Sequence, residues 1–98
     1  MTKKLEKLAA AGLQVLPASE ITTHFVVERD GFVALVKRVG DDFGEAGSPG
    51  LLTEQGFAAL VWRGGRPFFV AKNLDLPANR GQVEGLRRFG EDLKTALA

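Results

Sequence analysis

The chain contains no cysteine, no tyrosine and only one histidine. The absence of cysteine excludes disulfides, zinc–thiolate sites and thiol catalysis. The single histidine, His24, excludes a multi-histidine metal site within one chain, and we interpret it as a strand residue at a sheet margin opposite Lys37. No serine or threonine stands in a nucleophile motif, and no phosphate-binding glycine fingerprint occurs. We therefore expect no catalytic residue, cofactor or metal, and an enzyme is the least favoured class.

Long apolar runs are also missing. No run approaches the roughly 20 residues that span a bilayer, and the first residues alternate charge with leucine instead of forming a signal-peptide core. We therefore expect a cytoplasmic protein with no membrane partner. The 98 residues suit a single domain over residues 1–98, and their hydrophobic and charged fractions of 45% and 26% are typical of a folded chain.

The formal net charge of +1 conceals an uneven distribution along the chain. Residues 40–56 carry four acids and no base, whereas residues 57–98 carry seven bases and four acids. Neither block is strong enough to predict a nucleic-acid or membrane partner from charge alone.

Two β-hairpins are the clearest signals in the sequence. Each consists of two apolar runs around a two-residue turn: residues 24–29 and 32–37 around Asp30-Gly31, and residues 57–63 and 66–72 around Gly64-Gly65. Such turns supply the positive φ angles of a tight hairpin and fix its register, so that Phe25 faces Val36 and Trp62 faces Pro67. Because proline cannot donate to a ladder, Pro67 predicts that strand 66–72 lies at a sheet edge, at least near its start.

Both faces of both hairpins are apolar. The first hairpin carries Phe25, Val27, Phe32, Ala34 and Val36 on one face, and Val26, Val33 and Leu35 on the other. The second carries Phe57, Ala59, Val61, Phe68 and Val70 on one face, and Leu60, Trp62 and Phe69 on the other. An antiparallel sheet with one wet face alternates apolar and polar residues, so this pattern predicts that both faces are covered.

Helices are predicted at both ends of the chain. The first is short, with Leu5 and Leu8 on its apolar side and Gly12 as its terminator, and a short extended piece follows over residues 13–16. Residues 17–20 are predicted to form a turn or loop. The last helix is amphipathic and begins at a capping box formed by Asn79 and Gln82.

The glycine- and acid-rich segment from Gly40 to Gly50 is predicted to be a mobile loop, since ordering four glycines is costly. Together these elements predict an α+β domain. We expect a two-layer arrangement in which a four- or five-stranded antiparallel sheet, built from the two hairpins, carries the short N-terminal helix and the C-terminal amphipathic helix.

Three functions are compatible with this fold. The leading hypothesis is a non-enzymatic self-associating or protein-interaction module, in which a homodimer covers the second sheet face because the N-terminal helix is too thin to do so. Its interface candidates are Leu60, Trp62, Phe69, Leu35 and Val33. The second is a nucleic-acid-binding module that uses the Trp62–Phe69 hairpin through Arg63, Arg66, Trp62 and Phe68. The third is a small-ligand-binding domain with loop 40–50 as a lid.

Overall fold

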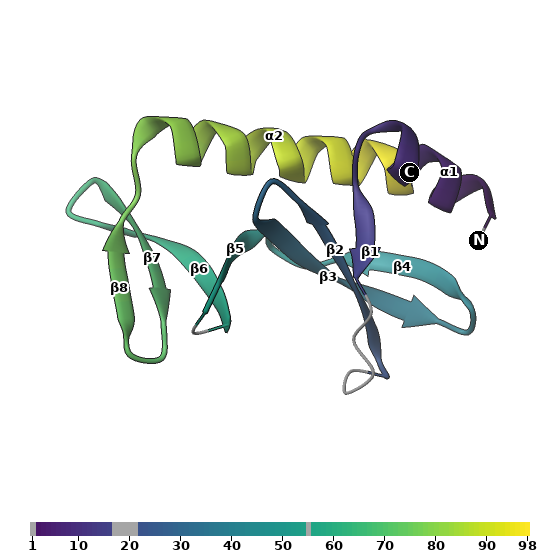
Figure 1. Cartoon of the computed structure of the whole chain (residues 1–98), viewed down its shortest axis with the longest axis horizontal. Coiled ribbons are helices and arrows are strands. Elements are labelled where there is room, and N and C mark those ends of the chain that lie inside the picture. The colour runs from purple at the N-terminus through teal and green to yellow at the C-terminus, as the bar shows by residue number, and fades with distance from the viewer. Residues whose placement is uncertain (1, 17–21, 55) are drawn as a thin grey trace.

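The described part of the computed structural model, residues 2–16, 22–54 and 56–98, folds as one curled antiparallel sheet of eight strands with two helices (Figure 1). In chain order the elements are α1 (Thr2–Ala10), β1 (Gln14–Leu16), β2 (His24–Arg29), β3 (Phe32–Val39), β4 (Asp42–Ala46), β5 (Gly50–Thr53), β6 (Gly56–Arg63), β7 (Arg66–Ala71), β8 (Leu74–Pro77) and α2 (Arg80–Leu97). The fold is α+β and resembles a half-barrel. The prediction of a four- or five-stranded sheet is wrong, because the sheet has eight strands.

The sheet has the strand order β1-β2-β3-β5-β6-β7-β8, and β4 also pairs with β3. One edge of β3 is shared by two partners. Its first residues, Phe32 and Val33, pair with β5, whereas Val36 to Val39 pair with β4 across a register shift. The sheet therefore branches at β3, with β4 beside the end of β3 and β5 beside its beginning.

The prediction of a mobile loop over residues 40–50 is wrong. The end of β3 has a second edge, on the side away from β2, and part of the predicted loop pairs with that edge. Asp42–Ala46 form β4 on that ladder, and a turn at Gly40, with φ of 63°, reverses the chain. The ring of Phe43 is buried and lies 4.5 Å from the ring of Phe25, centroid to centroid. This buried aromatic pair offsets the entropic cost of ordering a glycine-rich strand.

The prediction that strand 66–72 lies at a sheet edge is wrong beyond the start of the strand, because residues 68–70 have a partner on both sides. β7 pairs with β6 on one side and with β8 on the other, so β8 is the edge strand. Asn73 makes the reversal between β7 and β8 with a φ of 69°, a conformation that asparagine tolerates. Pro67 still takes part in the sheet through its carbonyl, which accepts a hydrogen bond from Ala78 N–H at 3.0 Å. The sheet lacks only the N–H donor that proline does not have.

The hairpin registers and both helices are confirmed. Phe25 pairs with Val36 and Trp62 with Pro67, as the two-residue turns predict. The capping box is present: Gln82 N–H donates to the Asn79 side chain at 2.8 Å, and the Gln82 side chain accepts from Asn79 N–H at 2.9 Å. The turn predicted over residues 17–20 lies outside the described residues.

The core consists of two clusters on one side of the sheet. The larger joins α1, α2 and the first hairpin, and the smaller joins α2 to the second hairpin; their fully buried side chains include Leu8, Val27, Phe89, Leu93 and Phe69. Arg29 links three elements around the larger cluster, because its guanidinium donates to the carbonyl of Ala11 at 2.8 Å and lies 2.9 Å from Asp92.

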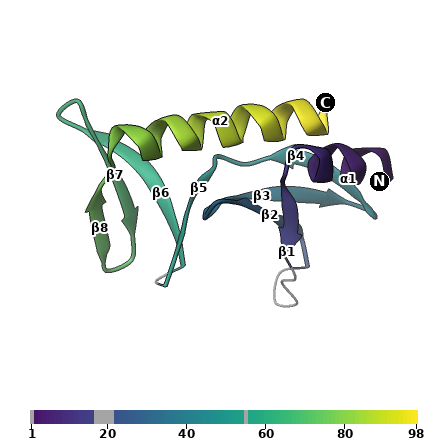
Figure 2. The ribbon, with the colours of Figure 1, turned by 45° about the horizontal axis from the view of Figure 1, so that its top comes forward.

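Both helices lie on the same side of the sheet (Figures 1 and 2). We call this the helix side and the opposite surface the outer face. α1 packs beside α2 and contributes Leu8 to the same core, so it covers none of the outer face. In the described ranges, neither helix is long and apolar enough to cross a membrane.

Candidate functional site

The outer face is a broad apolar surface that runs across β2, β3, β5, β6 and β7. Strand pairing places on it Val26, Val33, Leu35, Gly50, Leu52, Phe57, Ala59, Val61, Phe68 and Val70. Four large side chains of this set are well exposed: Leu35 (39%), Leu52 (46%), Phe57 (42%) and Val61 (37%). An exposed apolar area rimmed by polar residues is typical of an interaction surface.

At the centre of the outer face, Gly50 has no side chain, and the ring of Phe57 occupies the space that a side chain would take. A Cβ added at Gly50 would lie 2.5 Å from Cζ of Phe57 and 2.4 Å from the carbonyl oxygen of Ala58. The Phe57 ring therefore lies directly on the backbone of Gly50. Val33, the partner of Gly50 in the ladder, is only 3% exposed. The centre of the outer face is therefore closely packed, apolar and without a charged group.

Charged side chains lie around this centre. Arg63 is stacked over the Phe68 ring at 4.6 Å and pairs with Asp75 at 2.6 Å. At the other end, Glu28 accepts a hydrogen bond from the Gln14 side chain at 2.6 Å. An apolar centre with a polar rim is the usual anatomy of a protein–protein interface.

The molecule exposes more surface than a monomer of its size should. Its accessible surface is 6439 Å². The scaling of surface with mass gives about 5,400 Å² for a folded chain of 10.5 kDa. The radius of gyration, 13.6 Å, also exceeds the roughly 12.6 Å of a globular domain of this length. The chain as a whole thus exposes about 1,000 Å² more than expected for its mass.

The five predicted interface residues lie on two different faces. Leu35 and Val33 lie on the outer face, whereas Leu60, Trp62 and Phe69 lie on the helix side. Phe69 is fully buried and Trp62 is 58% exposed. The sequence reading missed Leu52, Phe57, Val61 and Val70 as members of the same face as Leu35. The signal that would have found them is the short strand β5. Because β5 pairs with both β3 and β6, it determines which residues of the two hairpins lie on the same face.

The predicted nucleic-acid residues are also divided. Arg63, Arg66 and Phe68 share the outer face, and Trp62 points to the helix side. Arg63 is already engaged by Asp75. The four side chains therefore do not form one stacking platform.

The segment predicted to act as a lid lies beside a groove of about 500 Å³ between β4 and the end of α2. Ala46, Pro49, Leu93 and Leu97 line its apolar part. Since residues 42–46 are held in a ladder with β3, this wall is part of the sheet.

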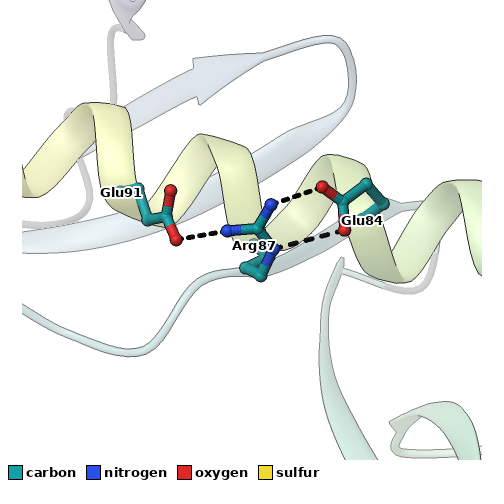
Figure 3. A network of polar contacts seen from close by, with 3 residues as sticks. All are labelled: Glu84, Arg87 and Glu91. Carbon is teal, nitrogen blue, oxygen red and sulfur yellow. Dashed lines mark hydrogen bonds and ion pairs between the residues drawn. The ribbon is translucent and has the colours of Figure 1, made fainter.

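Several titratable side chains form hydrogen bonds or ion pairs with neighbouring residues of the fold. His24 contacts the Thr23 hydroxyl at 2.8 Å and pairs with Lys37, as predicted. On the exposed side of α2, Arg87 binds both Glu84 and Glu91 (Figure 3). The hydrogen bond from Arg87 lowers the pKa of Glu84, and both carboxylates raise the pKa of Arg87. Within the described ranges, no three His, Asp or Glu side chains gather closely enough to hold a metal ion.

Comparison with protein families, curated proteins and solved structures finds no match to this chain. Its function is therefore inferred from its own surfaces.

Proposed function

We propose that the chain is a self-associating module in which two copies pack outer face against outer face. The observation that carries this proposal is the apolar outer face itself, with Leu35, Leu52, Phe57 and Val61 exposed at 37–46% while both helices lie on the other side. The occupant is a second copy of this chain, because the hollows found among the described residues all border α2 on the helix side, whereas a small ligand is held in a concave pocket.

The area supports this assignment. A stable protein–protein interface buries about 800 Å² on each partner. The excess surface of about 1,000 Å² over a monomer of this mass is of that size. Packing two outer faces would therefore bring the exposed surface of each copy back to the value expected for a globular protein.

The geometry suits two-fold symmetry. Two packed sheets stack face to face at about 10 Å, a distance that apolar side chains such as Phe57 and Leu52 can fill. In a two-fold interface the same patch meets itself, so each rim charge meets one from the opposite part of the patch. The rim carries both signs, with Glu28 on β2 and Lys37 on β3, and these can pair across the symmetry axis.

The test is sedimentation velocity on Leu52→Lys beside a matched control, Leu5→Lys. Both leucines are similarly exposed, 46% and 42%, but Leu5 lies on α1 on the helix side. Leu52→Lys places one unpaired ammonium from each copy into the interface, and the desolvation cost should convert the dimer to monomers. Leu5→Lys should leave the dimer intact. Circular dichroism checks that both variants fold.

A wild-type chain that sediments as a monomer would refute the proposal. So would equal sedimentation of both variants as dimers, because that result would place the interface elsewhere.

A further inference from the structure

A groove on the helix side of the sheet runs along α2. Three adjoining hollows form it, with volumes of about 350, 410 and 500 Å³. Trp62 and Val83 line both the first and the second hollow, and Pro49 and Gly90 line both the second and the third. The hollows therefore follow one another along α2, which spans the sheet from β7 and β8 to β4 (Figure 1).

The groove follows a single face of α2. Residues three or four positions apart lie on the same side of a helix, and the residues of α2 that line the groove have this spacing: Arg80, Val83, Leu86, Gly90, Leu93 and Leu97. The 18 residues of α2 make this face about 27 Å long. The site is therefore long, and its shape suits an extended molecule.

The walls of the groove are mostly apolar. The wall opposite α2 includes Ala46, Pro49, Leu60, Trp62 and Pro67. Within the described ranges, Ser48 contributes the only hydroxyl or amide side chain that lines it. A peptide would find few side-chain partners here for its backbone N–H and C=O groups, whereas a hydrocarbon chain needs none. Trp62 is 58% exposed, which is unusual for the largest apolar side chain of the protein.

The charges along the groove favour an anionic group at one end. The acid in the hollow beside Arg80 is Glu84, and both of its carboxylate oxygens are bound by Arg87. Among the described residues, no carboxylate lies within ion-pair distance of Arg80. At the other end, Lys94 shares its hollow with Glu45, so their charges cancel. The positive charge that remains is therefore that of Arg80.

We infer that the groove binds an unbranched hydrocarbon chain that ends in a carboxylate. The carboxylate pairs with Arg80, and the chain runs past Trp62 and over Gly90 towards Leu97. The passage at Gly90 is low because this residue has no side chain, and a Cβ built there would lie 3.3 Å from Cγ of Pro49. This site does not depend on self-association through the outer face.

The single tryptophan lies in the groove, so its emission reports binding directly. The probes are octanoate, dodecanoate and hexadecanoate, each below the concentration at which it forms micelles. We expect a saturable blue shift, because the chain displaces water from the indole. Affinity should rise about twofold for each added CH₂, less than for complete burial, since one side of the chain stays in water. Hexadecyltrimethylammonium, which has the same chain with a cationic head, should bind more weakly than hexadecanoate.

Substitutions locate the ligand. Arg80→Gln should weaken the binding of dodecanoate about threefold, as expected for an exposed charge pair, whereas Arg66→Gln on the outer face should bind as the wild type. Leu52→Lys should also bind as the wild type, which separates this site from the proposed dimer. Gly90 lies about 15 Å along the helix axis from Arg80, beyond the end of octanoate. Gly90→Leu should therefore leave octanoate binding unchanged and remove the advantage of hexadecanoate over dodecanoate.

Circular dichroism checks that each variant folds, and the comparisons of chain length and head group need no variant. The absence of a saturable shift with hexadecanoate would overturn the inference. Equal affinities for octanoate and hexadecanoate would show that the chain does not lie along α2. Equal binding of the cationic amphiphile would exclude the pairing with Arg80. A shift with anionic vesicles but not with monomeric fatty acids would indicate a membrane surface as the ligand and would also contradict the inference.

Discussion

Replacing Gly50 by alanine tests the close packing at the centre of the outer face. The added Cβ would lie 2.4 Å from the carbonyl oxygen of Ala58 and 2.5 Å from the Phe57 ring. The ring can rotate away, but the carbonyl belongs to the ladder between β5 and β6 and cannot move without disturbing it. Gly50 therefore has to be glycine for lack of space, not for its φ angle, which is not positive.

Overpacking of this kind costs about 1–3 kcal/mol, and the reduced entropy of the unfolded alanine chain returns about 0.4–1 kcal/mol. Because the closest contact of a Cβ at Gly50 is with backbone, we expect a net loss near the upper end, about 2 kcal/mol. For a domain of this size that lowers Tm by roughly 8–16 °C. The assay is urea and thermal unfolding followed by circular dichroism at one fixed protein concentration, because a dimer makes stability concentration-dependent.

The matched control is Gly81→Ala in the first turn of α2, where the nearest atom to the new Cβ is a side-chain oxygen of Asn79 at 3.3 Å. Its loss of stability should be far smaller than that of Gly50→Ala, since only a side-chain oxygen has to shift slightly and alanine favours a helix. Adding Phe57→Ala to Gly50→Ala should recover only part of the loss, because the contact with the Ala58 carbonyl remains. A Gly50→Ala protein as stable as the wild type would refute the packing described for this face.

Three other results are expected. Asn79→Ala removes the capping box of α2 and should cost about 1 kcal/mol in urea unfolding, and an unchanged midpoint would contradict this. The folded-state pKa of Glu84 is lowered by Arg87, so its stabilising contribution is present above the ordinary value of 4.5 and is lost as pH falls through the lowered pKa. Arg87→Met should flatten the stability profile in that acidic window; an identical profile would oppose the assignment. Arg29→Met should cost about 1.5–3 kcal/mol by removing charged hydrogen bonds that join three elements, whereas the exposed Arg88→Met should cost little.

Local chemistry was enough to predict the hairpins and the helices. Asp30-Gly31 and Gly64-Gly65 define turns of two residues, and such turns fix the register by themselves. In the same way, Asn79 and Gln82 satisfy the first N–H groups of α2 with their own side chains. These features depend on neighbours in sequence, and the structure has them where they were expected.

The additional strands could not be predicted in that way, because they depend on distant partners. β4 has the composition of a loop and becomes a strand only because the second half of β3 offers an unpaired edge and Phe43 meets Phe25. Likewise β8 is four residues long and ends at Pro77. Propensity gives little indication of such short edge strands.

The covered face could not be assigned from the sequence because both faces of each hairpin are apolar. The helix side takes Phe25 and Val36 from the first hairpin but Leu60 and Phe69 from the second. Only the pairing of β5 with β3 and β6 shows which residues of the two hairpins share a face. The sequence predicts no strand there, because Gly50 falls in the predicted loop and residues 51–53 belong to neither hairpin. The predicted interface therefore combined residues from both faces of the sheet.

We propose above that the outer face is buried between two copies of the chain. Light scattering of the wild-type chain over a dilution series in the micromolar range tests it most directly. If two copies pack through their outer faces, the measured mass is twice the chain mass of 10.5 kDa at the higher concentrations, and the dimer dissociates only on dilution. A mass of one chain at every concentration would contradict it and would leave the outer face exposed in solution.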